Sequence, residues 1–275
     1  MRPDFLVIGS QKAGTSTLWA VLRAHPQVWM PAHKELSFFN DERAFGAGLG
    51  AYEAHFEAAP RRARRVGEAS PGYVCHPAVP RRVYDALPGA RLILTVRNPI
   101  DRAWSQYWDA RRQLRVPFHF EEAVDRALET QWQPGRIGYF SRGVYLPAIE
   151  AWLAHFPRER LHIVVLEDLR RDPSTVWRAL FRVLGIDEGF QTPVMSRRTN
   201  ESAVFGHPIY RWFLEKPERT RLLPRGSRSL LLRGPLEPYN YPAMDPATRA
   251  RLVDFYRPHN AALEAFLGRP LGWDR

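Results

Sequence analysis

The pattern of hydrophobic and polar residues predicts strands that alternate with helices along the whole chain. Runs at 5–8, 91–97 and 161–166 are short and almost entirely apolar, as in strands that are buried on both faces. A further short strand is expected before 67, and an edge strand at 28–30. Helical spacing of apolar residues occurs at 14–24, 79–87, 121–131, 145–156, 177–184 and 246–267. This alternation predicts an α/β fold with a P-loop-like central parallel sheet flanked by helices.

The chain has 275 residues, a length that suits one large α/β domain. No repeat and no long linker divides it, so we expect a single domain over 1–275. Residues 190–240 are the least regular part, because proline and glycine repeatedly interrupt their aromatic residues and arginines. A flap over a ligand, a binding wall and a plain surface excursion all fit that composition.

The turn after the first predicted strand has the features of an anion-binding loop. Gly9 and Gly14 bound a tight turn that enters a helix, and helix N-termini attract anions through their N–H groups and dipole. Lys12 adds a positive charge inside the turn. The spacing is that of the motif G-x-x-x-x-G-K-[ST], except that Thr15 occupies the lysine position. This shift argues against the usual Mg-ATP geometry, and an ordinary turn with a surface lysine is the alternative.

A carboxylate and a lysine adjoin in a second polar segment. His33, Lys34 and Glu35 precede an apolar group at 36–39 that would anchor them against the core. A carboxylate held near a phosphate-binding loop is a candidate general base. The alternative is an exposed ion pair above a buried phenylalanine.

A third polar group follows the strand at 91–97. Arg97 ends that strand, Asp101 can cap the next helix, and Ser105 lies within that helix. Ligands of open α/β sheets bind at the carboxyl ends of the strands, so Arg97 and Ser105 could converge on one phosphate. A salt-bridged Arg97 with Asp101 as a simple helix cap is the alternative.

Two acids, Glu167 and Asp168, end the strand at 161–166. They could hold Mg²⁺, but we favour a role in capping the next helix, because the first loop lacks the usual metal-binding hydroxyl after its lysine. The nine histidines and the one cysteine, Cys75, do not form a zinc spacing. No metal is therefore expected.

The formal net charge of +11 favours anionic partners, including nucleotides, sulfated or phosphorylated compounds, nucleic acid and acidic membranes. An arginine-rich composition alone would give the same charge. No apolar run approaches the roughly 20 residues of a membrane helix, and strand one begins too early to leave room for a signal peptide. These features predict a soluble, cytoplasmic protein. Aromatic residues within 104–140 and 205–213 either line an apolar pocket or pack in the core.

Together the motifs resemble those of the PAPS-dependent sulfotransferases (PAPS is 3′-phosphoadenosine-5′-phosphosulfate), in particular a bacterial branch similar to the heparan sulfate N- and O-sulfotransferases. Residues 9–18 are similar to the 5′-phosphosulfate loop, 34–39 to the segment with the catalytic base, and 97–107 to the 3′-phosphate motif. The resemblance extends from about residue 4 to the C-terminus.

The resemblance implies PAPS as the sulfuryl donor, PAP (adenosine 3′,5′-bisphosphate) as the product, and an acceptor hydroxyl or amine on a glycan, lipid or natural product. It implies catalytic roles for Lys12, Glu35, Lys34 and His33. The implied nucleotide-binding residues are Gln11, Lys12, Ala13, Gly14, Thr15, Ser16, Thr17, Arg97, Ser105, Tyr145 and Arg233.

Two departures from the family pattern leave the acceptor open. Ala69 stands where heparan-type members have lysine, and 237–240 replaces their Lys-Gly-Arg stretch. Two other functions remain as alternatives. One is a P-loop kinase of small molecules with Glu167 or Asp168 on Mg²⁺, and the other is a non-catalytic binder of polyanions or nucleic acid, although no nucleic-acid motif is present.

Overall fold

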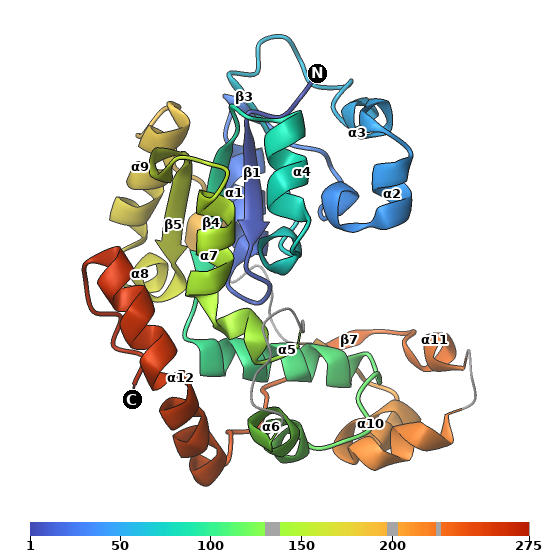
Figure 1. The fold of residues 1–275 in the computed structure, drawn as a ribbon. Coiled ribbons are helices and arrows are strands. Elements are labelled where there is room, and N and C mark those ends of the chain that lie inside the picture. The colour runs from blue at the N-terminus through green and yellow to red at the C-terminus, as the bar shows by residue number, and fades with distance from the viewer. Residues whose placement is uncertain (130–137, 197–202, 224–226, 275) are drawn as a thin grey trace. The chain divides into compact units, whose positions relative to one another are not determined.

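The computed structural model describes residues 1–129, 138–196, 203–223 and 227–274 (Figure 1). The chain forms two compact units that are interleaved in sequence: the first contains 1–98 and 145–199, and the second contains 99–144 and 200–275. No linker or change of composition marks this division in the sequence. The assignment of one functional domain over 1–275 stays a prediction.

The first unit contains the parallel sheet and the helices that cover it. Its strands are β1 (Phe5–Gly9), β2 (Val28–Trp29), β3 (Arg65–Ala69), β4 (Arg91–Val96) and β5 (Leu161–Val165). Its helices are α1 (Thr15–Ala24), α2 (Glu42–Gly46), α3 (Leu49–Ala54), α4 (Val79–Ala86), α7 (Tyr145–Leu153), α8 (Leu166–Arg171) and α9 (Pro173–Leu184).

The sheet has the order β2-β3-β1-β4-β5, and every pairing in it is parallel. The predicted α/β fold with a central parallel sheet is therefore confirmed, as is the edge position of β2. β1 lies in the middle, with Phe5 opposite Gly67 of β3 and Arg91 of β4. Helices cover both faces, and in Figure 1 α7 lies in front of β4 while α4 lies beside β1.

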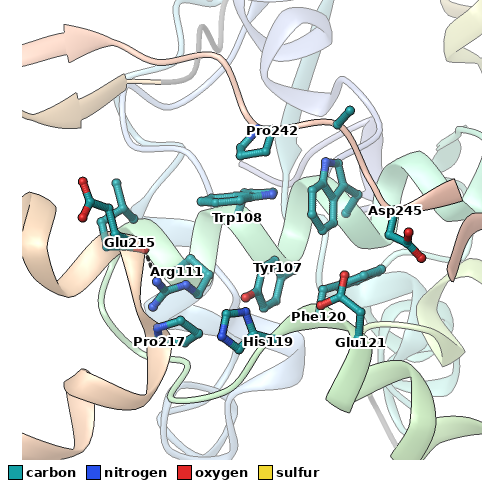
Figure 2. Close-up of a pocket in the computed structure, with 13 residues that line it drawn as sticks. Tyr107, Trp108, Arg111, His119, Phe120, Glu121, Glu215, Pro217, Pro242 and Asp245 are labelled. Atoms are coloured by element: carbon teal, nitrogen blue, oxygen red, sulfur yellow. Dashed lines mark hydrogen bonds between the residues drawn. The ribbon is translucent and has the colours of Figure 1, made fainter.

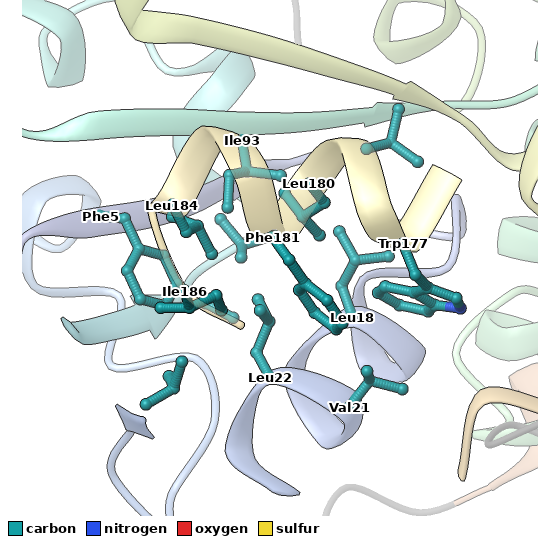
Figure 3. Close-up of a cluster of buried hydrophobic side chains, with 14 of the residues drawn as sticks. Phe5, Leu18, Val21, Leu22, Ile93, Trp177, Leu180, Phe181, Leu184 and Ile186 are labelled. Carbon is teal, nitrogen blue, oxygen red and sulfur yellow. The ribbon is translucent and has the colours of Figure 1, made fainter. Parts of the chain in front are cut away.

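The core of the first unit forms where α1 and α9 meet one face of the sheet. Figure 3 shows Phe5 and Ile93 of the sheet in one cluster with Leu18 and Phe181 of these helices. All four side chains are fully buried. A Cβ atom at Gly67 would lie 2.2 Å from Cζ of Phe5, so the neighbouring strand needs glycine to admit the ring.

The second unit is mainly helical and has its own aromatic core. Its elements are α5 (Pro99–Arg112), α6 (Phe120–Glu129), β6 (Ala203–Phe205), α10 (Pro208–Glu215), α11 (Arg228–Leu231), β7 (Leu236–Pro238) and α12 (Pro246–Leu267). β6 and β7 pair in antiparallel fashion. Asp245 caps α12 by accepting a hydrogen bond from the Thr248 N–H, as the Asp-Pro sequence predicts.

One predicted boundary is wrong. α5 begins at Pro99, so Asp101 lies inside its first turn and not at the N-cap position before it. Its carboxylate pairs with Arg249 at 2.9 Å. The last residues of the predicted helix at 121–131 and parts of the 190–240 excursion lie outside the described residues.

Candidate functional site

Every strand of the sheet leads into a polar segment at its carboxyl end. β1 leads into the loop at 10–14, β3 into Ser70, β4 into Arg97, and β5 into Glu167. The segment after β2 is anchored beside β3, because the Glu35 N–H donates to the Ala69 carbonyl at 2.9 Å. After β1 the chain forms β2 and β3 on one side of that strand, and it then crosses to form β4 on the other side. Ligands of open α/β sheets bind at such a switch point, so this edge is the candidate site.

The loop after β1 is attached to the end of β4. The Ser10 N–H donates to the Thr95 carbonyl at 2.8 Å, and Oγ1 of Thr95 donates to the Gly9 carbonyl at 2.9 Å. These contacts fix the point at which the chain leaves the sheet. The loop therefore begins at a fixed position on the sheet and not at a free strand end.

The loop enters α1 with its backbone in left-handed conformations. Lys12 has φ +67° and Gly14 has φ +91°. A Cβ atom at Gly14 would lie 2.8 Å from Cδ1 of Leu166, so glycine is also needed for space. Among the described residues no side chain caps the start of α1, and its first turn contains no acid. No carboxylate in that turn offsets the positive end of the helix dipole, so the residues present fit a phosphate group.

Arg97 and Tyr145 lie against this loop. Nη1 of Arg97 donates to the Lys12 carbonyl at 3.1 Å. Oη of Tyr145 donates to the Arg97 carbonyl at 2.7 Å and accepts from the Arg97 N–H at 3.3 Å. The structure thus brings together three residues that the sequence placed in one nucleotide site. Their roles in binding stay predictions.

The segment with the candidate base is strained and anchored. Glu35 has φ +66° and Ser37 has φ +52°, a conformation that costs a residue other than glycine roughly 1–2 kcal/mol. Nζ of Lys34 lies 2.8 Å from Oε1 of Glu35, and the side chain of Glu35 is 48% exposed. His33 is exposed. The Glu35 carboxylate is therefore accessible, as a base for an external substrate must be, and it adjoins a cation.

A buried carboxylate, Glu68, lies behind this segment. It is 2% exposed and accepts three hydroxyl hydrogen bonds: from Tyr52 and Tyr73 at 2.9 Å each, and from Ser70 at 2.7 Å. Burial raises the pKa of Glu68, and the three hydrogen bonds oppose that rise. Burial also raises the pKa of both tyrosines, which therefore remain hydroxyl donors.

The acids after β5 have structural contacts. Oε1 of Glu167 accepts from the Asn98 N–H at 3.0 Å, and Asp168 pairs with Arg171 at 2.7 Å. Asp172, rather than either of these acids, caps α9. In the described part of the chain, no group of three or more histidine, cysteine or acidic residues could hold a metal ion.

Two predicted nucleotide contacts are in the second unit. Ser105 lies on α5, and Arg233 lies exposed between α11 and β7. Arg97 belongs to the first unit and Ser105 to the second, so their proposed convergence on one phosphate stays a prediction. The same holds for Arg233 as part of a nucleotide clamp.

The second unit contains a cavity of about 290 Å³ with aromatic walls. Figure 2 shows Tyr107, Trp108 and Phe120 around it, and Trp104 also lines it. The expectation of an aromatic-lined pocket is thus correct for this stretch, although Arg111, histidine and acids make it only partly apolar. In 205–213 the buried aromatic residues belong to the core of the unit, which is the other alternative, and none of them lines this cavity.

Sequence reasoning missed Glu68 and its three partners. An acid inside a strand is usually exposed, and the two tyrosines are 16 and 5 residues away from it. One feature of the sequence that points to the site was not used, namely the placement of its lysines. The chain relies on arginine for positive charge and has lysine only at 12, 34 and 216, so two of its lysines fall in the candidate site.

Comparisons with known proteins point to one family. A family profile described as "Sulfotransferase domain" matches residues 2–202. The mouse protein "Bifunctional heparan sulfate N-deacetylase/N-sulfotransferase 4" is 30% identical over 286 residues, which cover 98% of this chain and 30% of that protein. Mouse "Heparan sulfate glucosamine 3-O-sulfotransferase 6" is 28% identical over 278 residues, which cover 99% of this chain and 74% of that protein. This chain spans about 30% of the length of the first curated relatives it matches.

Solved structures show the same fold. A sulfotransferase from Alicyclobacillus acidocaldarius matches over the whole of both chains, with a TM-score of 0.72 and 27% identity. The "Sulfotransferase Domain from the Curacin Biosynthetic Pathway" has a TM-score of 0.50 at 16% identity, with 94% of this chain and 98% of that chain covered. The second likeness concerns the fold alone.

Proposed function

Because the chain belongs to the sulfotransferase family, we propose that it moves a sulfuryl group from PAPS to a hydroxyl or amine of an acceptor. The observation that carries this proposal is the grouping at the carboxyl edge of the sheet. There the Lys12 loop contacts Arg97, and the segment with Glu35 is anchored to the end of β3. When bound, PAPS supplies the sulfuryl group and leaves as PAP.

Two groups of the chain would act on the reacting atoms. Lys12 and the N–H groups at the start of α1 would supply positive charge to the leaving phosphate as negative charge develops on it, as an oxyanion hole does. Glu35 would accept the proton of the acceptor, a contribution of about 10²- to 10⁴-fold. Lys34 holds that carboxylate through the 2.8 Å ion pair, and His33 is the second candidate base.

Other residues would bind and orient. Arg97 and Ser105 would hold the 3′-phosphate, which distinguishes PAPS from ATP, and Tyr145 fixes the backbone of Arg97. Arg233 is a candidate for closing the nucleotide site. The acceptor class stays open between glycan, lipid and natural product. Heparan sulfate appears in the names of relatives, so a desulfated heparin is the first acceptor to test.

Nucleotide binding is tested by calorimetry and thermal shift with PAP. Lys12→Ala should weaken PAP binding by about ten- to one-hundred-fold, the range for a lost hydrogen bond to a charged group. Lys216→Ala is the matched control, because it removes an exposed lysine to which no role in nucleotide binding is assigned. Binding of ATP–Mg in preference to PAP would contradict the proposal and favour a kinase.

Catalysis is tested by transfer of ³⁵S from labelled PAPS to de-N-sulfated heparin, a phenol and a long-chain alcohol. Glu35→Gln should lower the rate of transfer by about 10²- to 10⁴-fold while PAP still binds, because the hydrogen bonds of Glu35 within the described residues join it to Lys34 and Ala69, which lie outside the loop. Undiminished turnover in that variant would assign the role of base to His33.

A further inference from the structure

Behind the candidate base, a chain of hydrogen bonds connects a buried charge to a strained backbone. The Ser37 N–H donates to Oγ of Ser70 at 3.0 Å, and the Phe39 N–H donates to Oη of Tyr73 at 3.4 Å. The same two hydroxyls donate to Glu68, at 2.7 Å and 2.9 Å. Each hydroxyl thus accepts from the segment with Glu35 and donates to one carboxylate.

We propose that Glu68 is a positioning residue, which holds the backbone at 35–39 in the conformation that aims Glu35 at the acceptor. A serine or tyrosine hydroxyl has one proton. When that proton points to the Glu68 carboxylate, the lone pairs of the oxygen are left for the N–H groups of Ser37 and Phe39. The carboxylate therefore sets the direction of both hydrogen bonds.

The strain in the segment at 35–39 explains why its backbone has to be held in place. Glu35 and Ser37 both have positive φ, and residues other than glycine keep that conformation only where their surroundings enforce it. The contacts that hold these two residues include the bond from the Glu35 N–H to the Ala69 carbonyl and the bond from the Ser37 N–H to Oγ of Ser70. Both acceptors directly follow Glu68 at the end of β3. The strained turn and the buried charge thus belong to one structural unit.

Tyr52 supplies a natural control. Its hydroxyl donates to Oε1 of Glu68 at 2.9 Å, as that of Tyr73 does, but no bond from the 35–39 backbone to it is recorded among the described residues. Its ring stacks on Phe38 at 4.8 Å, and phenylalanine would keep that contact. Tyr52→Phe therefore removes a donor to Glu68 without breaking the connection to the base segment, whereas Tyr73→Phe breaks it.

Hydrogen exchange measured by mass spectrometry tests whether Glu68 holds the backbone at 35–39, and it needs no acceptor substrate. Glu68→Gln keeps the side-chain shape but turns one acceptor oxygen into an N–H₂ donor. Depending on which oxygen is replaced, either Ser70 loses its acceptor or Tyr52 and Tyr73 do. Exchange in peptides covering 37–39 should become about ten-fold faster, the size expected for one lost hydrogen bond. Ser70→Ala should act likewise if Glu68→Gln folds poorly, and Tyr52→Phe should leave this exchange unchanged. Unchanged exchange in both Glu68→Gln and Ser70→Ala would overturn the proposal.

A double-mutant cycle tests whether Glu68 acts through Glu35, and this step rests on the proposed function. Glu68→Gln should lower kcat for ³⁵S transfer by about ten- to one-hundred-fold, as small misplacements of reacting groups do, with PAP affinity unchanged. In the Glu35→Gln background the same change should have no further effect on the residual rate. An equal loss in both backgrounds would show a merely structural role. Loss of transfer in Glu35→Gln with full transfer in Glu68→Gln would refute the positioning role and leave the proposed function intact.

Discussion

Replacing Gly14 with alanine tests the account of the loop that enters α1. The new Cβ would lie 2.8 Å from Cδ1 of Leu166, and the residue would keep φ near +91°. A left-handed alanine costs roughly 1–2 kcal/mol, and an overpacked contact costs roughly 1–3 kcal/mol. The two effects together predict a loss of about 2–5 kcal/mol in the free energy of unfolding. Single domains have a total of about 5–15 kcal/mol, so the variant should still fold.

Gly268→Ala separates the two effects. Gly268 has φ +68°, and a Cβ atom there would have nothing within 4 Å. This control should therefore show only the conformational cost, about 1–2 kcal/mol. Urea denaturation at 25 °C, analysed by linear extrapolation, measures both variants.

Leu166→Ala completes the experiment, because it removes the atom that clashes. Leu166 is 8% exposed, so its truncation alone should cost about 2–5 kcal/mol. The double variant should be less destabilised than the sum of the single variants by about 1–3 kcal/mol, the cost of the relieved contact. If the two changes add within about 0.5 kcal/mol, or if Gly14→Ala costs no more than Gly268→Ala, the clash is not real.

Three further predictions concern single residues. Burial raises the pKa of Glu68 above 4.5, so the folded state binds the proton more tightly than the unfolded state does. The free energy of unfolding should therefore fall as the pH rises from 4.5 through the raised pKa of Glu68. Glu68→Gln should remove this part of the pH dependence of urea unfolding. Identical pH profiles for the variant and the parent protein would contradict the prediction. Tyr145→Phe loses two hydrogen bonds to the Arg97 backbone and should cost about 1–2 kcal/mol in urea unfolding, with weaker PAP binding by calorimetry; unchanged PAP affinity would separate Tyr145 from the site. Asp245→Ala removes the cap of α12 and should cost about 0.5–2 kcal/mol in unfolding free energy; a neutral effect would mean that the Thr248 N–H finds another partner.

The sheet could be predicted wherever the strands are short runs of mostly apolar residues. β1, β4 and β5 are such strands, and their expected positions agree with the structure within one or two residues. β3 was harder to place, because Gly67 and Glu68 interrupt its apolar pattern. The start of α5 was misplaced at Asp101, although Pro99 is the residue type that favours the first helical position.

The candidate site was predictable where one short segment contains its chemistry. The loop with Lys12 needs only the sequence between a strand and the next helix. The polar cluster behind Glu35 could not be foreseen, because Glu68 accepts hydroxyl hydrogen bonds from Tyr52 and Tyr73, which come from other elements. Spacing along the chain does not reveal that a charged strand residue is satisfied from so far away.

The interleaving of the two units has a consequence for synthesis on the ribosome. β4 ends at Val96, but its partner β5 begins only at Leu161, after the first segment of the second unit has been made. Until then β4 is an unpaired edge of aliphatic residues, which is open to pairing with other chains. The nascent chain therefore cannot finish its first unit before starting its second. Fragments that end between 97 and 160 should aggregate rather than fold on their own.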